Sequence, residues 1–204
     1  MIIGIDEVGR GPLAGPVCVA AFFIYEPRDF KRLVRATARK IDAPLKDSKK
    51  LHKSRREAWS NVAHQWRREG KCDFAICYVH AGTIDRIGIA PSIARALRNT
   101  LSRLGRTHPH ISFASTVTIL LDGGLKAPMQ YKKQETIVRG DEKEIAISLA
   151  SIVAKVHRDA YMTKLSKKHP EYGFEKHAGY GTKAHYAAIK KYGSTSHHRK
   201  TFLD

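Results

Sequence analysis

Five short apolar runs along the chain predict the strands of a central sheet. The first opens the chain and stops at two adjacent acids, and the second follows after a short turn rich in glycine and proline. Because so short a connection cannot hold a crossover helix, these two strands are expected to be antiparallel neighbours. The other runs also have the residue types of strands. The predicted strands cover residues 1–6, 17–25, 73–80, 116–121 and 135–138.

Between these runs, apolar positions at helical spacing predict helices. Residues 28–40 are basic and loosely helical, and Ser54 has the capping-box position that opens a second helix. Pro91 suits the start of a third helix, and Gly140 introduces the longest one, whose apolar positions follow the 3.6-residue period. Thr182 is a candidate N-cap for a last short helix.

The composition changes near Ser166, where Lys, His, Tyr and Gly become frequent. We expect residues 1–165 to form the main domain and residues 166–204 to form a small C-terminal helical appendage. A chain of 204 residues, 42% of them hydrophobic, is long enough for one such core.

The net charge separates this chain from an ordinary globular protein. Lys and Arg number 37 and Asp and Glu number 19, which gives a formal charge of +18. A charge of this size and sign favours a polyanionic partner. Nucleic acid comes first and an anionic membrane surface second, and a basic surface that binds neither is the alternative.

Cysteine use and hydropathy indicate the compartment. Cys18, Cys72 and Cys77 form no C-x-x-C pair, which argues for a reducing compartment and against a disulfide framework. No segment has the length and apolarity of a transmembrane helix, and the acidic start of the chain is unlike a secretory signal. We therefore expect a cytoplasmic protein with no membrane partner.

Three carboxylates stand where predicted elements begin or end. Asp6 and Asp122 end apolar strands, and Asp141 precedes the longest helix. Strand-end acids brought to one edge of a sheet can form an oxygen-rich site for Mg²⁺ or Mn²⁺. Two such ions roughly 3.5–4 Å apart can activate a water and stabilise the leaving oxygen of a phosphodiester. Glu7 is a fourth candidate, although neighbours in a strand face opposite ways unless the chain twists there.

Each of these features also has a purely structural interpretation. Asp122 before Gly123 is a turn signal, and Asp141 with Glu144 has the form of a helix N-cap. The glycine-rich turn at residues 9–11 leaves backbone N–H groups open to an anion, but it is also a plain turn after a strand.

Blocks of sequence with recognisable content follow one another over nearly the whole chain. They are residues 4–17 (GIDEVGRGPLAGPV), 47–51 (DSKKL), 121–123 (LDG), 140–141 (GD), 150–159 (ASIVAKVHRD), 172–174 (YGF), 177–182 (HAGYGT) and 198–202 (HRKTF). In this order they resemble the type 2 ribonuclease H family, ribonuclease HII. An acidic pair alone would be a weak match, whereas blocks in one order are highly specific.

The resemblance implies a ribonuclease H-like α/β fold, a mixed sheet flanked by helices with a C-terminal helical segment that binds substrate. It implies Mg²⁺- or Mn²⁺-dependent hydrolysis of the RNA strand of RNA–DNA hybrids. It also implies incision on the 5′ side of ribonucleotides embedded in duplex DNA, leaving 3′-hydroxyl and 5′-phosphate ends. We expect a monomer, and no sliding-clamp motif is visible in the sequence.

The resemblance also assigns site residues by motif position. Gly9, Arg10 and Gly11 are expected to read the ribose 2′-hydroxyl, the group that distinguishes RNA from DNA. Tyr180 matches the tyrosine that packs against the adjacent deoxyribose, and the alternative is an exposed tyrosine in a glycine-rich loop. The catalytic and metal-binding acids are expected to be Asp6, Glu7, Asp122 and Asp141.

Several basic residues are candidates for further contacts. Lys49, Lys155 and Arg199 are candidate phosphate ligands, although in so basic a chain each can equally be a solvated charge. Asp159 is expected to be an ion-pair partner within the longest helix. The C-terminal histidines lack finger spacing and a cysteine pair, so we expect hydrogen bonds or phosphate proximity rather than zinc. They are His177, His185, His197 and His198.

Two other functions fit parts of the pattern. The type 3 ribonuclease H, which incises poorly at single embedded ribonucleotides, is the enzyme alternative, and Arg10 between two glycines favours type 2. A catalytically silent module that binds RNA–DNA duplexes is the alternative outside the enzymes. The presence of all four acids argues against it.

Overall fold

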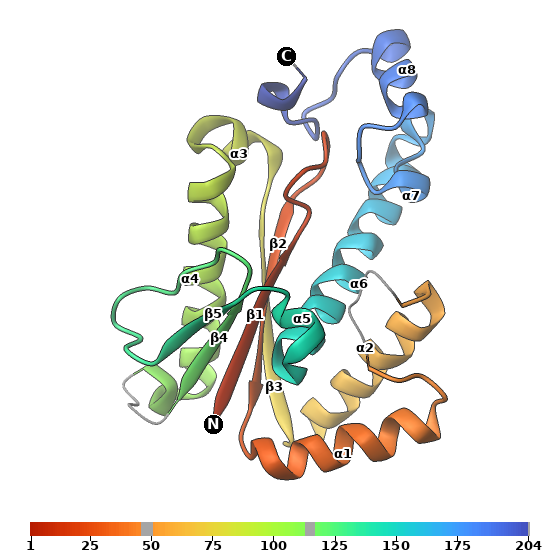
Figure 1. Cartoon of the computed structure of the whole chain (residues 1–204). Helices are drawn as coiled ribbons and strands as arrows, with labels where there is room; N and C mark the ends of the chain where they lie inside the picture. Colours follow the sequence, from red (N-terminus) through yellow and green to blue (C-terminus); the bar gives the residue numbers. More distant parts are fainter. Residues whose placement is uncertain (46–50, 113–116, 204) are drawn as a thin grey trace.

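A mixed five-stranded sheet lies at the centre of the computed structural model, which describes residues 1–45, 51–112 and 117–203 (Figure 1). The strand order is β3-β2-β1-β4-β5. β2 is antiparallel to β1 and β3, and β4 is parallel to β1 and β5. The strands are β1 (Ile2–Val8), β2 (Val17–Ile24), β3 (Cys72–Val79), β4 (Thr118–Asp122) and β5 (Gln134–Ile137). The predicted α/β fold with a mixed sheet and the antiparallel β1–β2 pair are confirmed.

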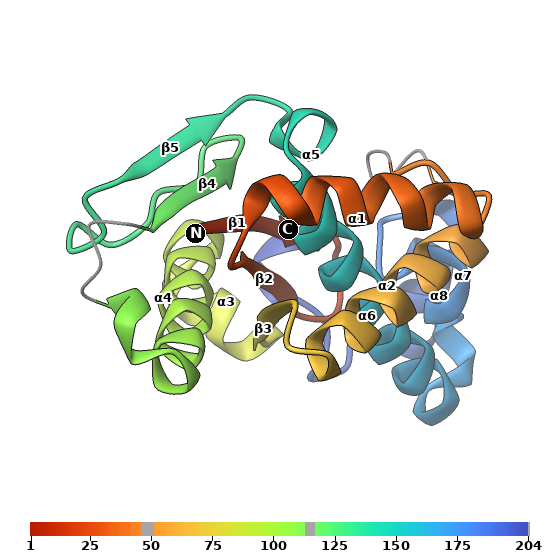
Figure 2. The same cartoon turned by 90° about the horizontal axis from the view of Figure 1, so that it is seen from below.

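Helices cover both faces of this sheet (Figure 2). One apolar core lies between the sheet and α4, and a second lies between the sheet and α1, α2 and α6. No helix in the described part of the chain is long and apolar enough to cross a membrane. The helices are α1 (Pro27–Lys40), α2 (Lys53–Arg68), α3 (Ala81–Ile87), α4 (Ile89–Thr107), α5 (Gly140–Lys143), α6 (Ile145–Lys168), α7 (Phe174–His177) and α8 (Lys183–Tyr192), with 3-10 turns η1 (Pro109–Ser112), η2 (Pro170–Tyr172) and η3 (Lys200–Phe202).

Two helix starts differ from the prediction. α2 begins at Lys53 with no side-chain cap, so the capping box at Ser54 is wrong, and the Ser54 hydroxyl lies 3.0 Å from Nδ1 of His52 instead. α4 begins at Ile89 rather than Pro91. It follows α3, which the pattern did not predict because seven residues are too few to display a helical period.

The start of the longest helix also differs. Gly140 and Asp141 form the separate short helix α5, and Glu144 with extended backbone (φ −116°, ψ 120°) divides α5 from α6. Glu144 is therefore the N-cap of α6, and the N-cap interpretation of Asp141 is wrong. α6 runs through the expected division near residue 166 to Lys168, so that division stays a prediction. Thr182 caps α8 as predicted, accepting a hydrogen bond from the backbone N–H of His185.

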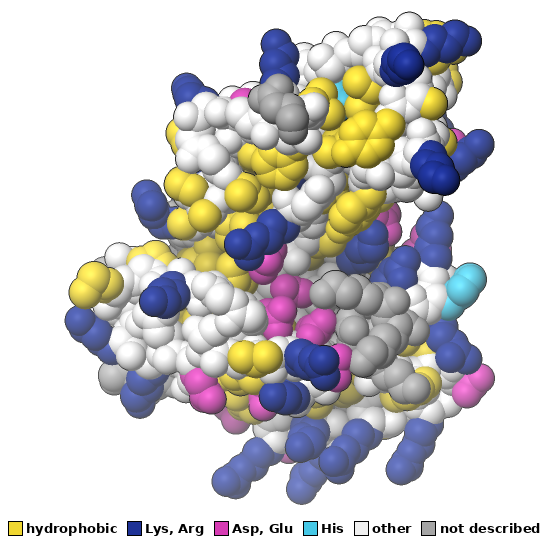
Figure 3. Space-filling model, turned by 45° about the horizontal axis from the view of Figure 1, so that its top comes forward, with side chains coloured by type: hydrophobic (Ala, Val, Ile, Leu, Met, Phe, Trp, Pro, Cys, Tyr) yellow, Lys and Arg dark blue, Asp and Glu magenta, His cyan; other side chains and the backbone are white. Residues whose placement is uncertain are grey.

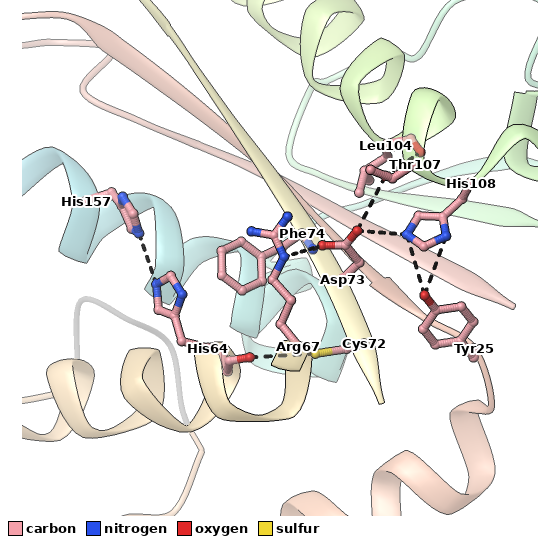
Figure 4. Close-up of polar contacts among 11 residues, drawn as sticks. Tyr25, His64, Arg67, Cys72, Asp73, Phe74, Leu104, Thr107, His108 and His157 are labelled. Carbon is pink, nitrogen blue, oxygen red and sulfur yellow. Dashed lines mark hydrogen bonds and ion pairs between the residues drawn. The ribbon is translucent and has the colours of Figure 1, made fainter. Parts of the chain in front are cut away.

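Polar side chains close the outer edge of β3 (Figure 4). The buried Asp73 accepts hydrogen bonds from Arg67 Nε (2.6 Å), His108 Nε2 (2.7 Å), the Phe74 backbone N–H (2.7 Å) and the Thr107 hydroxyl (3.5 Å). Arg103 donates to the carbonyl of Ile76 further along the edge. These bonds occupy edge groups that would otherwise be free to pair with another strand. The side chains of Arg67, Asp73, His108 and Arg103 therefore have a structural role at this edge.

α6 crosses β1 at Gly4 with almost no space between the two backbones. A side chain at Gly4 would overlap the backbone of Ala146. Asp6 projects to the same face of β1, because residues two apart in a strand share a face. The close crossing therefore holds α6 over the acidic end of β1.

We expect Gly4→Ala to lower the free energy of unfolding by about 3 kcal/mol, because the added methyl group meets backbone rather than a movable side chain. Gly124→Ala is the matched control, since a methyl group there meets open space, and it should change stability by less than about 0.5 kcal/mol. Urea unfolding of both variants measures the difference. Equal effects would contradict the close crossing of α6 and β1.

Candidate active site

Asp6 and Asp122 lie side by side on neighbouring parallel strands. Asp122 ends β4 as predicted, whereas β1 continues past Asp6 to Val8, so the prediction that Asp6 ends its strand is wrong. The register pairs Ile5 with Leu121, so the next residue of each strand stands at the same level and on the same face. That face is the one covered by α6, because Ile5 and Leu121 belong to the core on the α4 side. Asp6 is only 6% exposed, and Asp122 is half-buried. The two acids predicted from strand ends are therefore neighbours.

Asp141 reaches this region from α5. The backbone N–H of Gly140 donates to Asp122 Oδ1 over 2.7 Å, which ties the start of α5 to the end of β4. Arg139, just before it, adopts the left-handed conformation (φ 55°) and reverses the chain after β5. Asp141 is itself only 6% exposed. A hydrogen bond between elements thus brings the helix-borne acid beside Asp6 and Asp122.

Glu7 lies on the other face of β1. The pairing of β1 with β2 is uninterrupted from Ile2 to Val8, and the first residue with positive φ is Gly9 (φ 86°). The twist that was expected to turn Glu7 toward Asp6 is therefore absent within the strand. The Glu7 carboxylate instead lies 3.9 Å from the Arg10 guanidinium.

Burial and two neighbouring carboxylates disfavour the ionised form of Asp6. Burial raises the pKa of Asp6 to about 8, and the nearby carboxylates of Glu7 and Asp122 add to the rise. Hydrogen bonds from the Ser151 hydroxyl and the Glu7 backbone N–H act in the opposite direction but do not cancel it. Within the described part of the chain, no lysine or arginine forms an ion pair with Asp6 or Asp122.

This donor set suits a divalent cation. Among residues 1–45, 51–112 and 117–203, no three side chains of Asp, Glu, His or Cys are already close enough together to hold an ion. All the nearby donors are carboxylate oxygens, however, which Mg²⁺ and Mn²⁺ prefer. Burial first, and then the neighbouring carboxylates of Glu7 and Asp122, raise the pKa of Asp6, and a cation bound there would favour its charged form. The residues present therefore fit a cation that draws them together on binding.

The acidic side chains gather near the middle of one face of the molecule, with lysines and arginines around them (Figure 3). This distribution matches the neighbouring positions of Asp6, Asp122 and Asp141. A polyanion attracted by the basic surroundings would meet the acids at the centre of this face.

The Gly9–Gly11 turn belongs to a loop, residues 9–16, that Arg158 of α6 holds from inside. Arg158 is completely buried and donates to the carbonyls of Pro16 (2.9 Å), Ala178 (2.9 Å) and Ala14 (3.3 Å). A side chain at Gly9 would overlap the Arg158 guanidinium. The sequence pattern missed this residue, although its spacing to the buried Met162 and Leu165 is that of one helix face.

Arg199 holds the same loop from the C-terminal segment. It is completely buried and donates to the carbonyls of Gly15 (3.0 Å), Arg10 (2.8 Å) and Gly9 (2.6 Å). The prediction that Arg199 contacts a phosphate is therefore wrong, because the guanidinium is enclosed and directed at backbone carbonyls. Arg10 itself is exposed, and Gly11 faces open space.

Tyr180 is joined to this loop through the residue before it. The carbonyl of Gly179 accepts hydrogen bonds from the backbone N–H groups of Leu13 (2.8 Å) and Ala14 (3.2 Å). Tyr180 is 44% exposed. The tyrosine predicted to pack on a sugar and the turn predicted to read the 2′-hydroxyl therefore form one connected unit.

Of the two lysines predicted to contact phosphate, Lys155 and Lys49, the structure describes only Lys155. Lys155 donates to Asp159 Oδ1 over 2.7 Å, and Arg56 lies 3.9 Å from the same carboxylate. The prediction that Asp159 is an ion-pair partner within the long helix is confirmed. A phosphate contact from Lys155 would have to compete with this bond. Lys49 lies outside the described residues.

Two of the C-terminal histidines form a hydrogen-bonded relay that ends at Tyr180. The backbone N–H of Thr195 donates to His198 Nδ1 (2.9 Å), which leaves the proton of His198 on Nε2. That proton points to His185 Nε2 (3.1 Å), and His185 Nδ1 donates to the Tyr180 carbonyl (2.9 Å). Burial lowers the pKa of His198 to about 4, with His185 adding to the shift, and burial also lowers the pKa of His185. These hydrogen bonds therefore form with both imidazole rings neutral.

The mixed sheet, Asp6 of β1 beside Asp122 at the end of β4, and the third acid on α5 define a ribonuclease H-like nuclease. Solved structures agree in fold. The ribonuclease HII of a PCNA complex from Archaeoglobus fulgidus superimposes with a TM-score of 0.70 at 23% identity, covering 98% of this chain and 94% of that one. A ribonuclease HIII solved with Mn²⁺, Bst-RNase HIII, has a TM-score of 0.72 at 20% identity, covering 98% and 66%.

Sequence comparison resolves the type. The family model described as Ribonuclease HII matches residues 3–203. Ribonuclease HII of Bacillus cytotoxicus is 42% identical over 98% of this chain and 68% of its own length, and that of Chlorobium phaeobacteroides is 40% identical over 99% and 89%. The chain belongs to the ribonuclease HII family, as its sequence blocks predicted, and it is an endoribonuclease of the type 2 class.

Arg199→Lys should lower the free energy of unfolding by about 3 kcal/mol, because one ammonium group cannot serve three carbonyls at once. Amide hydrogen exchange in residues 9–15 should accelerate more than exchange in β2. Arg68→Lys, a swap at an exposed position, is the control and should leave both unchanged. Unaltered exchange in the loop of the Arg199 variant would refute its bracing role.

The neutral histidine relay predicts acid sensitivity. Below pH 6.5 the unfolded chain takes up protons at His185 and His198 while the folded chain does not, so stability falls as pH drops from about 6.5 toward 4. Each histidine contributes a slope of up to about 1.4 kcal/mol per pH unit. His198→Asn keeps an acceptor for Thr195 and should flatten this slope, whereas the exposed control His52→Asn should keep it. Urea unfolding across this pH range compares them, and an identical slope in all three proteins would contradict the prediction.

Proposed function

We propose that this protein cuts duplex DNA on the 5′ side of embedded ribonucleotides and hydrolyses the RNA strand of RNA–DNA hybrids, leaving 3′-hydroxyl and 5′-phosphate ends. One observation carries the proposal. The glycine turn begins three residues after Asp6 in the chain and is braced by two buried arginines. A group that recognises ribose is thereby held at a fixed position relative to the acids.

Asp6, Asp122 and Asp141 are the residues we assign to cation binding, with Glu7 as the fourth. Two divalent cations, Mg²⁺ or Mn²⁺, would supply the activation of water and the neutralisation of the leaving oxygen. The chain's own contribution is to align the acids, through the β1–β4 register and the Gly140–Asp122 hydrogen bond. Bst-RNase HIII, which has a similar fold, was solved in complex with Mn²⁺, and this supports the choice of ions.

Gly9, Arg10 and Gly11 are the residues we assign to the ribose 2′-hydroxyl, and Tyr180 to the adjoining deoxyribose. Open space at Gly11 leaves its backbone accessible, and the partly exposed Tyr180 ring has an apolar face to offer a sugar. Residues 166–204 would then form the substrate-binding segment beside the catalytic domain of residues 1–165. Lys155 and Lys49 remain proposed phosphate contacts.

The deciding assay uses duplex DNA with one embedded ribonucleotide, incubated with Mg²⁺, with Mn²⁺ or with a chelator. We expect a nick 5′ to the ribonucleotide in either metal and none in the chelator, with a 3′ end that a polymerase extends. Asp122→Asn should reduce the rate by more than about 100-fold, since a cation ligand is lost. Glu57→Gln, which removes an exposed carboxylate on α2, is the control and should cut normally.

Three outcomes would contradict parts of this proposal. Cleavage of an RNA–DNA hybrid without a nick at the single ribonucleotide would indicate the type 3 activity. Binding without any cleavage would indicate a silent binding module. Full activity in a correctly folded Asp122→Asn would refute the site assignment.

A further inference from the structure

We propose that the outward face of α1 binds the phosphate backbone of duplex nucleic acid that extends beyond the catalytic acids. The inference rests on the proposed function only in taking a nucleic-acid duplex as the substrate. It adds a binding surface on an element that carries none of the residues assigned above.

α1 has two faces of opposite character. Phe30 and Val34 are buried against the sheet and α2, and Trp66 packs on the Phe30 ring. At 100° per residue, the cations cluster on the side opposite these apolar residues. They are all exposed and comprise Arg28, Lys31, Arg32, Arg35 and Arg39.

This arrangement costs the helix stability. Arg28 and Arg32, and again Arg35 and Arg39, are like charges at i,i+4 spacing, which destabilises a helix. Cations in the first turn also oppose the helix dipole. The sequence of α1 contains a single acid, Asp29, which lies 3.6 Å from Arg32 in a highly exposed pair. A merely solvated face would carry acids and bases interspersed, whereas this one is suited to an anionic partner.

The basic face borders the candidate active site. A cavity of about 450 Å³ has Arg35 and Arg39 of α1 on one wall and Asp141 on the other. Glu142, Lys143 and Glu144 also line the cavity beside Asp141, so its carboxylates gather on that side and its two arginines lie on the α1 side, which favours an anionic ligand there. In Figure 3, Lys and Arg side chains line the lower edge of the molecule, where Figure 1 places α1.

The dimensions of α1 match a nucleic-acid strand. Its 14 residues span about 21 Å, and its cations recur every three or four residues, or about 5–6 Å. One strand of a duplex presents a phosphate about every 3.4 Å of its axis, so several phosphates lie within reach of the helix at once. Arginine suits this contact because its planar guanidinium donates two parallel hydrogen bonds to phosphate oxygens.

α4 provides a matched control for charge alone. It carries the exposed residues Arg95, Arg98 and Arg106 and packs on the opposite face of the sheet from α1. Removing three arginines from either helix changes the net charge equally. Arg35 and Arg39 of α1 line the cavity that contains Asp141, and no arginine of the α4 set does.

The test compares the triple variant Arg28→Gln, Arg35→Gln, Arg39→Gln with the triple variant Arg95→Gln, Arg98→Gln, Arg106→Gln. Fluorescence anisotropy measures binding to an all-DNA duplex of about 30 base pairs in chelator, from about 50 to 200 mM salt. The α1 variant should lose about 2–3 from the magnitude of the slope of log affinity against log salt, so its affinity relative to wild type changes about 16- to 64-fold over this range. The α4 variant should keep the wild-type slope.

Binding to uncut DNA in chelator needs no catalysis, so this result stands apart from the incision assay. Melting temperatures check folding, and the α1 variant should be at least as stable as wild type because like-charge repulsion is removed. Equal slope changes in both variants would reduce the effect to net charge and overturn the proposal. A wild-type slope in the folded α1 variant would overturn it as well, and would leave an acidic protein surface as the partner of α1.

Discussion

Two buried guanidinium groups, with backbone carbonyls as their hydrogen-bond partners, hold the loop on which the site depends. Arg158 and Arg199 each donate three hydrogen bonds to carbonyls in or beside residues 9–16. Burial lowers the pKa of Arg199 to about 10, with repulsion from Arg158 adding to the shift, and burial lowers that of Arg158 too. Burying two guanidinium charges costs desolvation free energy. The loop needs these hydrogen bonds, because it forms no strand whose backbone pairing would define its shape.

This bracing joins the ends of the chain into one unit. Arg199 binds the loop from the C-terminus, an isolated bridge pairs Ala14 with His198, and Gly179 accepts from two loop amides. The histidine relay then fixes the carbonyl of Tyr180. The helical segment after α6 is therefore part of the wall that shapes the glycine turn, and a change in its packing reaches the turn through backbone hydrogen bonds.

The sequence predicted those strands and helices whose apolar residues repeat in a clear local pattern. Apolar runs located the five strands of the sheet, and Asp6 and Asp122 came with two of them, since the parallel register of β1 and β4 places these acids at the same level. Only Asp122 ends its strand as predicted, because β1 continues through Glu7 to Val8. The short helices α3 and α5 were not predicted, because they are too short to show a helical period of apolar residues. The burial of Arg158 and Arg199 was not predicted for a different reason. Arginine normally marks the surface, and only contacts between distant segments reveal that these two are enclosed.

The cationic surface and the acidic candidate centre act on a phosphate backbone in opposite ways. The protein is strongly cationic overall, yet its candidate catalytic centre concentrates carboxylates, and Asp6 is driven toward its neutral form by burial and by its neighbours. A phosphate backbone is therefore attracted to the molecule but repelled from the acids themselves. Divalent cations bound by these acids would reverse the local charge and give a phosphate a positive centre to approach. Ion binding and docking of a phosphate backbone would then favour one another.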